Sequence, residues 1–215
     1  MKGSGYLYKS FENLPEDKKG KIISVCMEEF VKHGYKQAST NTMVEKAGIS
    51  KGILYHYFGN KKNLYLYLVD KSMEYYLSEL EEFYGQDIPD IFERLLKFAL
   101  AKLKLIEKDL IMYEFTAKAF MDIPEELSKE LKYRYDKIYL EEMPKVFANV
   151  DTSKLKMDVD VNKLIETILF CLEGLNAKYI KLLKDKIISY SDMNYKILEE
   201  CMSYLDIIKY GAYES

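Results

Sequence analysis

The sequence contains few residues that interrupt helices. Its 215 residues include only four prolines and ten glycines. A shortage of both favours long helices joined by short connections. Apolar residues make up 48% of the chain, which is enough for a hydrophobic core in one large or two small domains. We therefore expect an all-α protein.

Cysteine is also scarce. Cys26, Cys171 and Cys201 lie far apart in apolar helical stretches, and their odd number gives no closed disulfide framework. No two of them have the spacing of a zinc site, so we expect no bound metal. Small buried thiols in a reducing cytoplasm are the simplest interpretation.

Long apolar runs are missing as well. No uncharged stretch reaches the ~20 residues that a membrane-spanning helix needs. The N-terminal stretch MKGSGYLYKS lacks the apolar core of a signal peptide. We expect a cytoplasmic protein that does not enter a membrane.

Catalytic signatures are absent from the sequence. His33 and His56 have no nucleophile or metal ligand at a recognisable spacing, and there is no glycine-rich phosphate loop. Acidic pairs such as Glu28-Glu29 are more simply explained as solvated helix faces. We expect the protein to be no enzyme and to need no cofactor.

Two short helical patterns, residues 40–47 and 51–58, follow one another across a glycine. Ser39 and Ser50 are suited to cap the first amides of the two helices, and Gly48 can adopt the left-handed conformation that ends the first. This spacing is typical of a helix-turn-helix.

The second of these helices is too short to be stable alone, since about 12 to 15 residues are needed in water. Ile53, Leu54 and Phe58 are candidates for the side that packs on its neighbours. The outer face then combines one cation, one glycine and polar aromatic side chains: Lys51, Gly52, Tyr55, His56 and Tyr57. Such a face suits a DNA groove, because hydroxyl and ammonium groups reach phosphates and glycine permits a close approach. The alternative is a surface helix whose tyrosines merely pack.

The charge of the chain is divided unevenly. Residues 1–62 carry eleven lysines and six acidic residues, a net charge of +5, while the rest of the chain carries −8, for a total of −3. A basic N-terminal region on an acidic body suits oriented docking on DNA.

The N-terminal region resembles the TetR family of bacterial transcription regulators. The match runs from Ile22 to Leu64 and rests on Phe30, Gly34, Tyr35, Ser39, Ala47, Gly48, Ser50, Lys51, Gly52, Leu54, Tyr55, Tyr57, Phe58 and Lys61. The resemblance implies a three-helix helix-turn-helix head and a C-terminal helical body that binds an effector and dimerises, with about nine helices in all. We accordingly divide the chain into an N-terminal arm (1–14), a DNA-binding domain (15–62) and an effector-binding and dimerisation domain (63–215).

The resemblance also implies which residues contact DNA. Ser39, Lys51, Tyr55, Tyr57 and Lys61 are expected to hold phosphates, with Gly52 and His56 closest to the bases. Asn41 can read adenine, but many family members carry a longer basic residue there, and this departure leaves the operator sequence open.

Periodicity predicts the other helices. We expect one from Pro15 to Gly34 and a long one from Lys61 to about Phe83, capped by Asn60. Further helices are expected over 88–106, 109–121, 124–147, 159–185 and 191–209, with a kink at Pro144 and a loop over 148–157.

The last two helices carry apolar stripes wider than one neighbour can cover. Such a pair can pack on the same pair of a second copy and form a four-helix, two-fold interface. The residues assigned to it are Leu164, Ile168, Leu172, Leu175, Tyr179, Ile197, Cys201, Leu205 and Ile208. The alternative is that both stripes serve the intramolecular core.

The resemblance implies a cavity for a small, apolar or aromatic effector in the body. Candidate lining residues are Tyr75, Tyr76, Tyr113, Glu114, Phe115, Phe120, Tyr135, Tyr139, Phe170, Glu173 and Asn176. The expected protein is a homodimeric repressor that binds a palindromic operator in double-stranded DNA and is released by the effector. The alternative is a constitutive DNA-binding or partner-binding dimer without a small ligand.

Overall fold

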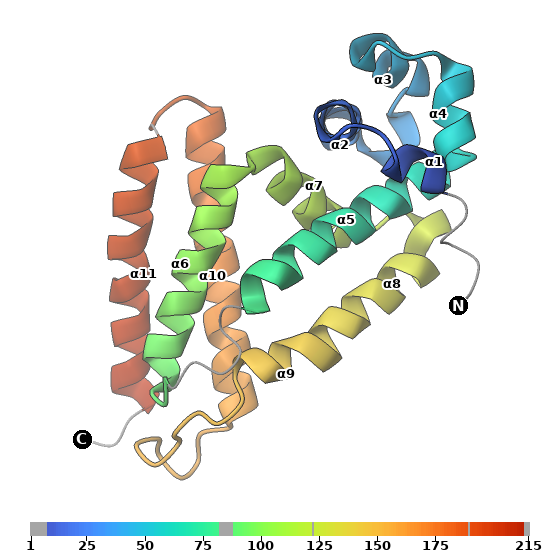
Figure 1. Cartoon of the computed structure of the whole chain (residues 1–215). Coiled ribbons are helices and arrows are strands. Elements are labelled where there is room, and N and C mark those ends of the chain that lie inside the picture. The colour runs from blue at the N-terminus through green and yellow to red at the C-terminus, as the bar shows by residue number, and fades with distance from the viewer. Residues whose placement is uncertain (1–7, 82–87, 122, 189, 213–215) are drawn as a thin grey trace. The chain divides into compact units, whose positions relative to one another are not determined.

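A computed structural model of the chain describes residues 8–81, 88–121, 123–188 and 190–212. These residues form a succession of helices and loops, and no β-strand occurs among them (Figure 1). The prediction of an all-α fold is confirmed. Among the described helices, none is long and apolar enough to cross a membrane.

The chain folds as two compact units. The first, here called the head unit, comprises Met1–Ser78 and Asp109–Glu142; the second, the body unit, comprises Glu79–Lys108 and Met143–Ser215. The predicted domains are 1–14, 15–62 and 63–215, whereas the contacts in the structure group residues 109–142 with the N-terminal helices.

The head unit begins with two helices, α1 (Lys9–Glu12) and α2 (Glu16–Gln37). Pro15, predicted as the first helical residue, is instead the N-cap of α2, and Glu16 follows in the first turn, where the helix dipole favours acids. The predicted stop at Gly34 is a break, because Gly34 has a φ of 68° and one more turn follows it.

The helix-turn-helix consists of α3 (Thr40–Ala47) and α4 (Lys51–Phe58) and is followed by α5 (Lys61–Glu81). The head unit also contains α7 (Leu110–Met121), the 3-10 helix η1 (Glu125–Leu127), α8 (Ser128–Lys137) and the π-helix η2 (Ile138–Glu142).

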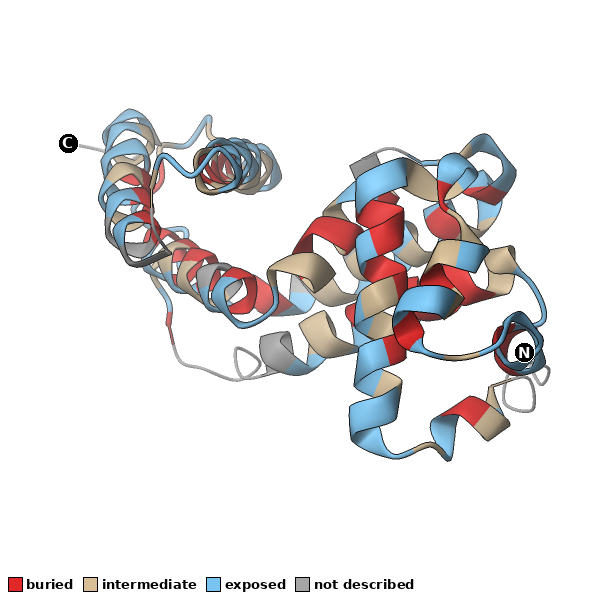
Figure 2. Cartoon of the chain, turned by 90° about the horizontal axis from the view of Figure 1, so that it is seen from above, coloured by how far each residue is buried: buried red, intermediate tan, exposed pale blue. Residues whose placement is uncertain are grey.

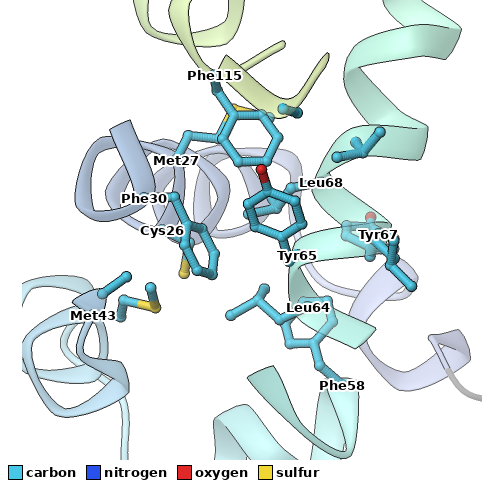
Figure 3. Close-up of a cluster of buried hydrophobic side chains, with 14 of the residues drawn as sticks. Cys26, Met27, Phe30, Met43, Phe58, Leu64, Tyr65, Tyr67, Leu68 and Phe115 are labelled. Carbon is cyan, nitrogen blue, oxygen red and sulfur yellow. The ribbon is translucent and has the colours of Figure 1, made fainter. Parts of the chain in front are cut away.

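The core of the head unit forms around the first half of α5. Residues 64–69 are all buried, because neighbouring helices enclose α5 on several sides. Figure 3 shows Leu64 and Tyr65 among side chains from α2, α3 and α4, with Phe115 of α7 closing one side. The rings of Phe30 and Tyr65 meet edge to face at 4.9 Å. This packing holds the short α3 and α4, which could not persist alone.

Two polar contacts attach the later helices to this core. Arg134 of α8 donates two hydrogen bonds to the carboxylate of Asp70 on α5, from Nε at 2.5 Å and from Nη2 at 2.7 Å. The ammonium of Lys118 on α7 donates to the carbonyl of Val31, near the break in α2. Both are charge-assisted contacts, which are stronger than neutral hydrogen bonds.

The body unit consists of α6 (Ile91–Lys108), α9 (Met143–Val146), α10 (Val161–Lys184) and α11 (Tyr190–Ala212). Helix α11 packs on both α10 and α6. The buried residues follow one side of each helix, as Figure 2 shows. Arg94 is buried here at 6% exposure and donates to the carbonyls of Ile88, Val146 and Ala148, which compensates for the burial of its charge.

One predicted helix is not continuous. The stretch 124–147, expected as a single helix with a kink, is divided into η1, α8, η2 and α9. Pro144 lies in α9 directly after the π-helix and has no N–H to donate, so a regular helical ladder cannot run through this point.

Candidate nucleic-acid interface

Local capping positions the first helix of the helix-turn-helix. Ser39 Oγ accepts the amide of Thr42 at 3.4 Å, and Gly48 ends α3 with a φ of 72°, as predicted. The backbone amide of Ser39 donates in turn to the Glu29 carboxylate at 3.0 Å. Glu29 is only 3% exposed, and this hydrogen bond connects α2 to the start of α3. This role of Glu29 was not predicted from the sequence.

Similar signals define α4 and the start of α5. Ser50 Oγ accepts the amide of Ile53 at 3.2 Å, so α4 begins where the sequence predicts. Asn60 Oδ1 accepts the amide of Asn63 at 2.8 Å, which confirms Asn60 as the cap of α5. The starts of α4 and α5 are therefore both capped by side chains that can be read from the sequence, while α4 ends at its C-cap Gly59.

The surface of α4 presents the predicted combination of groups. Lys51, Gly52, Tyr55 and His56 are all exposed. The hydroxyl of Tyr55 lies 3.4 Å from Thr40 Oγ1, so the face of α4 is joined to the start of α3. The exposed Asn41 follows Thr40 directly. Thr40 belongs to this surface although the sequence analysis did not select it.

Two residues of α4 differ from the predicted burial. Ile53, expected to pack inward, is 41% exposed, and Tyr57, expected on the outer face, is only 8% exposed. Tyr57 is buried by α1, a helix that was not predicted. Its Phe11 ring meets the Tyr57 ring edge to face at 5.4 Å and covers it. Tyr57 as a whole is thus mainly a packing residue here, unlike Tyr55.

Lys61 is also engaged within the chain. Its ammonium donates to the carbonyls of Lys36, at 3.1 Å, and Ala38, at 3.2 Å, and lies 5.0 Å from the centre of the Tyr35 ring. A cation at carbonyls near the end of α2 is favourable, because the helix dipole is negative there. Of the predicted phosphate ligands, Lys51 keeps an exposed side chain, whereas Lys61 stabilises the connection from α2 to α3.

The predicted effector residues do not form one group. In the head unit, Tyr76 of α5 lies near Tyr75 and Tyr113, with ring centres 6.1 and 6.5 Å apart, and Phe120 contacts Tyr135 at 5.9 Å. Burial, then the neighbouring Tyr113, raises the pKa of Tyr76 above its usual range.

Other candidates for the effector site have different surroundings. Phe115 is a core residue at 1% exposure, because it packs on Phe30 and Tyr65. Glu114 is buried at 6%, Tyr135 is 46% exposed, and the side chain of Tyr139 lies outside the described residues.

In the body unit, Phe170 is 75% exposed and Glu173 is exposed, so neither lines a cavity within that unit. Asn176 does line one. This cavity has a volume of about 10 Å³ and lies between α6, α10 and α11, where its other walls are apolar: Ala99, Leu100, Leu172, Leu175, Ile197, Leu198 and Cys201. It has room for about one water molecule.

The residues assigned to a dimer interface lie in the core of the body unit. All are buried, except the half-buried Ile208, because the stripes of α10 and α11 pack against each other and α6: Leu164, Ile168, Leu172, Leu175, Tyr179, Ile197, Cys201 and Leu205. Within a single chain the buried members of this set serve the intramolecular core, and the dimer interface itself stays a prediction. The exposed apolar side chains on these helices are Phe170, Met202, Tyr204, Ile207 and Tyr210.

No cluster of metal-ligating side chains occurs within the part of the chain that the structure describes. What the described residues do assemble is a three-helix unit, α2 to α4, that presents a capped two-turn helix with a cation, a glycine and hydrogen-bonding aromatic groups on its outer side. This is the architecture of helix-turn-helix proteins.

Comparisons with known proteins agree with this class. Residues 22–68 match the family of bacterial regulatory proteins, tetR family. The repressor SCO4008 of Streptomyces coelicolor is 27% identical over 120 residues, 55% of this chain and 60% of that protein. The sequence matches thus span no more than about three fifths of that curated relative.

Solved structures extend the likeness to the whole chain. A TetR family transcriptional regulator from Chloroflexus aurantiacus superimposes with a TM-score of 0.68 at 24% identity, covering 96% of this chain and 98% of that one. The regulator FadR of Bacillus subtilis, in complex with stearoyl-CoA, gives a TM-score of 0.63 at 19% identity, covering 85% and 96%. The N-terminal region thus matches the tetR family in sequence, and most of the chain shares the fold of these structures.

Proposed function

We propose that this protein is a transcriptional regulator that acts in the cytoplasm, binds a palindromic operator in double-stranded DNA as a homodimer and catalyses no reaction. The head unit supplies the DNA-binding surface through α4, with the exposed start of α3 beside it. Lys51 and Tyr55 reach phosphates, and Gly52 and His56 approach the bases. Asn41 contacts either, and Ser39, Tyr57 and Lys61 contribute mainly by positioning these groups.

The observation that carries the proposal is Gly52. Glycine inside a helix costs roughly 0.5–1 kcal/mol relative to alanine. The fold itself does not require it, because a methyl group at residue 52 would have only Ser50 Oγ nearby, at 3.9 Å. Gly20 of α2 has the same freedom, but Gly52 lies beside Lys51 on the exposed face of α4, where the missing side chain would let a DNA groove approach the backbone.

The test is binding to duplex DNA from upstream of the coding region, against a scrambled duplex, over a series of salt concentrations. Tight, sequence-dependent binding that weakens steeply with salt is expected, because bound lysines displace counterions from several phosphates. Complete absence of binding at low salt would overturn the proposal.

The proposed dimer would form through exposed side chains of α10 and α11. Helices α10 and α11 pack on each other, with the ammonium of Lys178 2.7 Å from Glu200, and they carry the exposed apolar side chains of Phe170 and Ile207. Their exposures of 75% and 65% leave an apolar area for a second copy. Two heads on one two-fold axis would bind two operator half-sites, which compensates for the small contact that one short helix makes.

We further propose that the protein is a repressor released by an apolar effector. The relative SCO4008 is a repressor by name, and the similar FadR structure contains stearoyl-CoA. The aromatic group of Tyr75, Tyr76 and Tyr113 in the head unit is the part of the predicted lining that comes together. Stearoyl-CoA, stearate and coenzyme A should be added separately to the protein–operator complex. Release by the acyl compounds but not by coenzyme A is expected.

A constitutive DNA-binding dimer is the alternative. The cavity of about 10 Å³ in the body unit does not admit such a molecule without rearrangement. Thermal unfolding separates the two functions, because a ligand of the folded state raises its melting temperature. If neither acyl compound raises the melting temperature or releases DNA, the repressor proposal fails for this class of effector and the constitutive alternative stands.

A further inference from the structure

The short helix α1 precedes the family match, which starts at residue 22, yet it is part of the head core. Phe11 has an exposure of 0%. Its ring lies 4.8 Å from Phe58 and 5.4 Å from Tyr57, both on α4, and 5.5 Å from Tyr67 on α5. One side chain of α1 thus contacts both the end of the recognition helix and the helix that follows it.

Polar contacts hold α1 in this position. Glu12 Oε1 accepts the hydroxyl of Tyr67 at 2.8 Å and lies 3.1 Å from the ammonium of Lys71. The ammonium of Lys19 donates to the Glu12 carbonyl at 3.2 Å. Burial alone would raise the pKa of Glu12, but the hydrogen bonds from Tyr67 and Lys71 outweigh it, and the pKa lies below its ordinary value. Glu12 is therefore ionised at neutral pH and keeps these contacts.

Helix α4 also packs on α5, where the ring centres of Phe58 and Tyr67 are 5.2 Å apart. Its buried residues are Leu54, Tyr57 and Phe58, and Phe11 contacts the last two. At the other side of α4, Tyr55 meets Thr40 of α3. The recognition helix thus lies between α3 and α1, and without α1 the rings near its C-terminal end would lose a fully buried partner.

We propose that α1 is a brace that sets the orientation of α4, so that Phe11 and Glu12 are positioning residues for sequence-specific DNA binding. The inference rests on the proposed function of α4. Hydrogen bonds to base edges require exact placement, whereas phosphate contacts carry no sequence information and are less demanding. Loss of the brace therefore lowers discrimination between operator and scrambled DNA more than it lowers nonspecific affinity.

An operator is first obtained by selection from random duplexes with the wild-type protein. The experiment then measures the ratio of the affinity for this operator to the affinity for a scrambled duplex. Phe11→Ala is expected to lower this ratio about tenfold, the size of one good base contact, with little change in the salt dependence. Phe11→Leu, which keeps most of the apolar volume, should retain most of the ratio.

A control separates positioning from general loss of stability. Leu131 of α8 is also fully buried in the head unit, and Leu131→Ala removes core volume there outside α1, α4 and α5. Each variant is first checked for helicity and melting temperature. Leu131→Ala is expected to lower the melting temperature and keep the affinity ratio. If Phe11→Ala does not fold, Glu12→Gln, which removes the charge beside Lys71, is measured instead and should lower the ratio to a smaller extent.

Several results would overturn the inference. An unchanged ratio in a folded Phe11→Ala or Glu12→Gln protein would show that α1 does not orient α4. Lys9→Ala alters only an exposed cation of α1. If it lowers the affinity ratio as much as Phe11→Ala does and also weakens the salt dependence, α1 contacts DNA directly. Failure of the wild-type protein to select any duplex is a different result, since it would overturn the proposed function itself.

Discussion

Ser50 Oγ would lie 3.9 Å from a methyl group on Gly52, an ordinary van der Waals distance. The helix can therefore accept alanine at this position without displacing any neighbour. The cap made by Ser50 and the helical conformation of Gly52 do not depend on the absence of a side chain. What a methyl group would alter is the exposed surface of α4.

Replacing Gly52 by alanine is expected to stabilise the protein by roughly 0.5–1 kcal/mol, because glycine loses more backbone entropy on folding. The same variant should bind the operator about tenfold more weakly, since the methyl group keeps the helix from the bases. Thermal unfolding and titration of a labelled duplex measure the two effects.

Gly20→Ala is the matched control. Gly20 lies in α2, and an added methyl group there would have no neighbour within 4 Å. It should give a similar gain in stability with unchanged DNA affinity. Wild-type affinity in the Gly52→Ala protein would remove Gly52 from the interface.

Lys51 and Lys61 are expected to behave differently when their charges are removed. Lys51→Met should leave stability nearly unchanged, because the exposed ammonium is 6.0 Å from its ring neighbour, but should reduce the salt slope of DNA binding by about 1. Lys61→Met should cost about 1 kcal/mol of stability, since the carbonyls of Lys36 and Ala38 lose a charged donor.

Urea unfolding and salt titrations of both variants provide the comparison. If Lys61→Met is as stable as the wild type and lowers the salt slope by the same amount as Lys51→Met, its ammonium serves DNA rather than the connection between α2 and α3.

The helix-turn-helix could be predicted because its signals are local. Ser39, Gly48 and Ser50 act on amides and dihedral angles within a few residues, and the structure places each of them as the sequence indicates. Which side of α4 is buried is not a local property. The burial of Tyr57 depends on Phe11, more than 40 residues away, in a helix too short to produce a periodic pattern.

The body unit illustrates the same limit. Periodicity identified apolar stripes on the last two helices, including Leu172 and Leu205, but it does not say whether a stripe faces the same chain or a second copy. The structure places both residues in the intramolecular core, at 5% and 6% exposure. Conversely, the aromatic character of Phe170 suggested a pocket residue. That character does not indicate exposure, and the side chain is 75% exposed.

Dimerisation can be tested on the exposed side of α11. Ile207→Glu places a charge on a residue that is 65% exposed, so the fold should remain stable while a dimer that buries this residue dissociates. Analytical ultracentrifugation is expected to show a monomer at concentrations where the wild type is a dimer. Operator binding should weaken at the same time, because the two DNA-binding heads are no longer linked.

Ile187→Glu is the control for this change. Ile187 is equally apolar and 66% exposed, but it lies in the loop between α10 and α11 rather than on a helix face. It should leave sedimentation unchanged. An undisturbed dimer in the Ile207→Glu protein would place the interface elsewhere.

The buried thiols should make both alkylation and protein stability depend on pH. Burial raises the pKa of Cys26 to about 12 and that of Cys201 to about 11, from a usual value of 9.0. Only the thiolate reacts with alkylating reagents, so both thiols should resist iodoacetamide in the folded protein at pH 8 and react in denaturant.

The same pKa values determine how stability changes at high pH. Between pH 9 and about 12 the unfolded chain has lost the thiol protons that the folded protein still holds, so unfolding releases protons and stability falls as pH rises. Peptide mass spectrometry of alkylated samples gives the labelling rate at each cysteine. Because Cys26 belongs to the head core and Cys201 to the body core, unequal protection would show which unit opens first. Equal, rapid labelling of both at pH 8 without denaturant would contradict their burial.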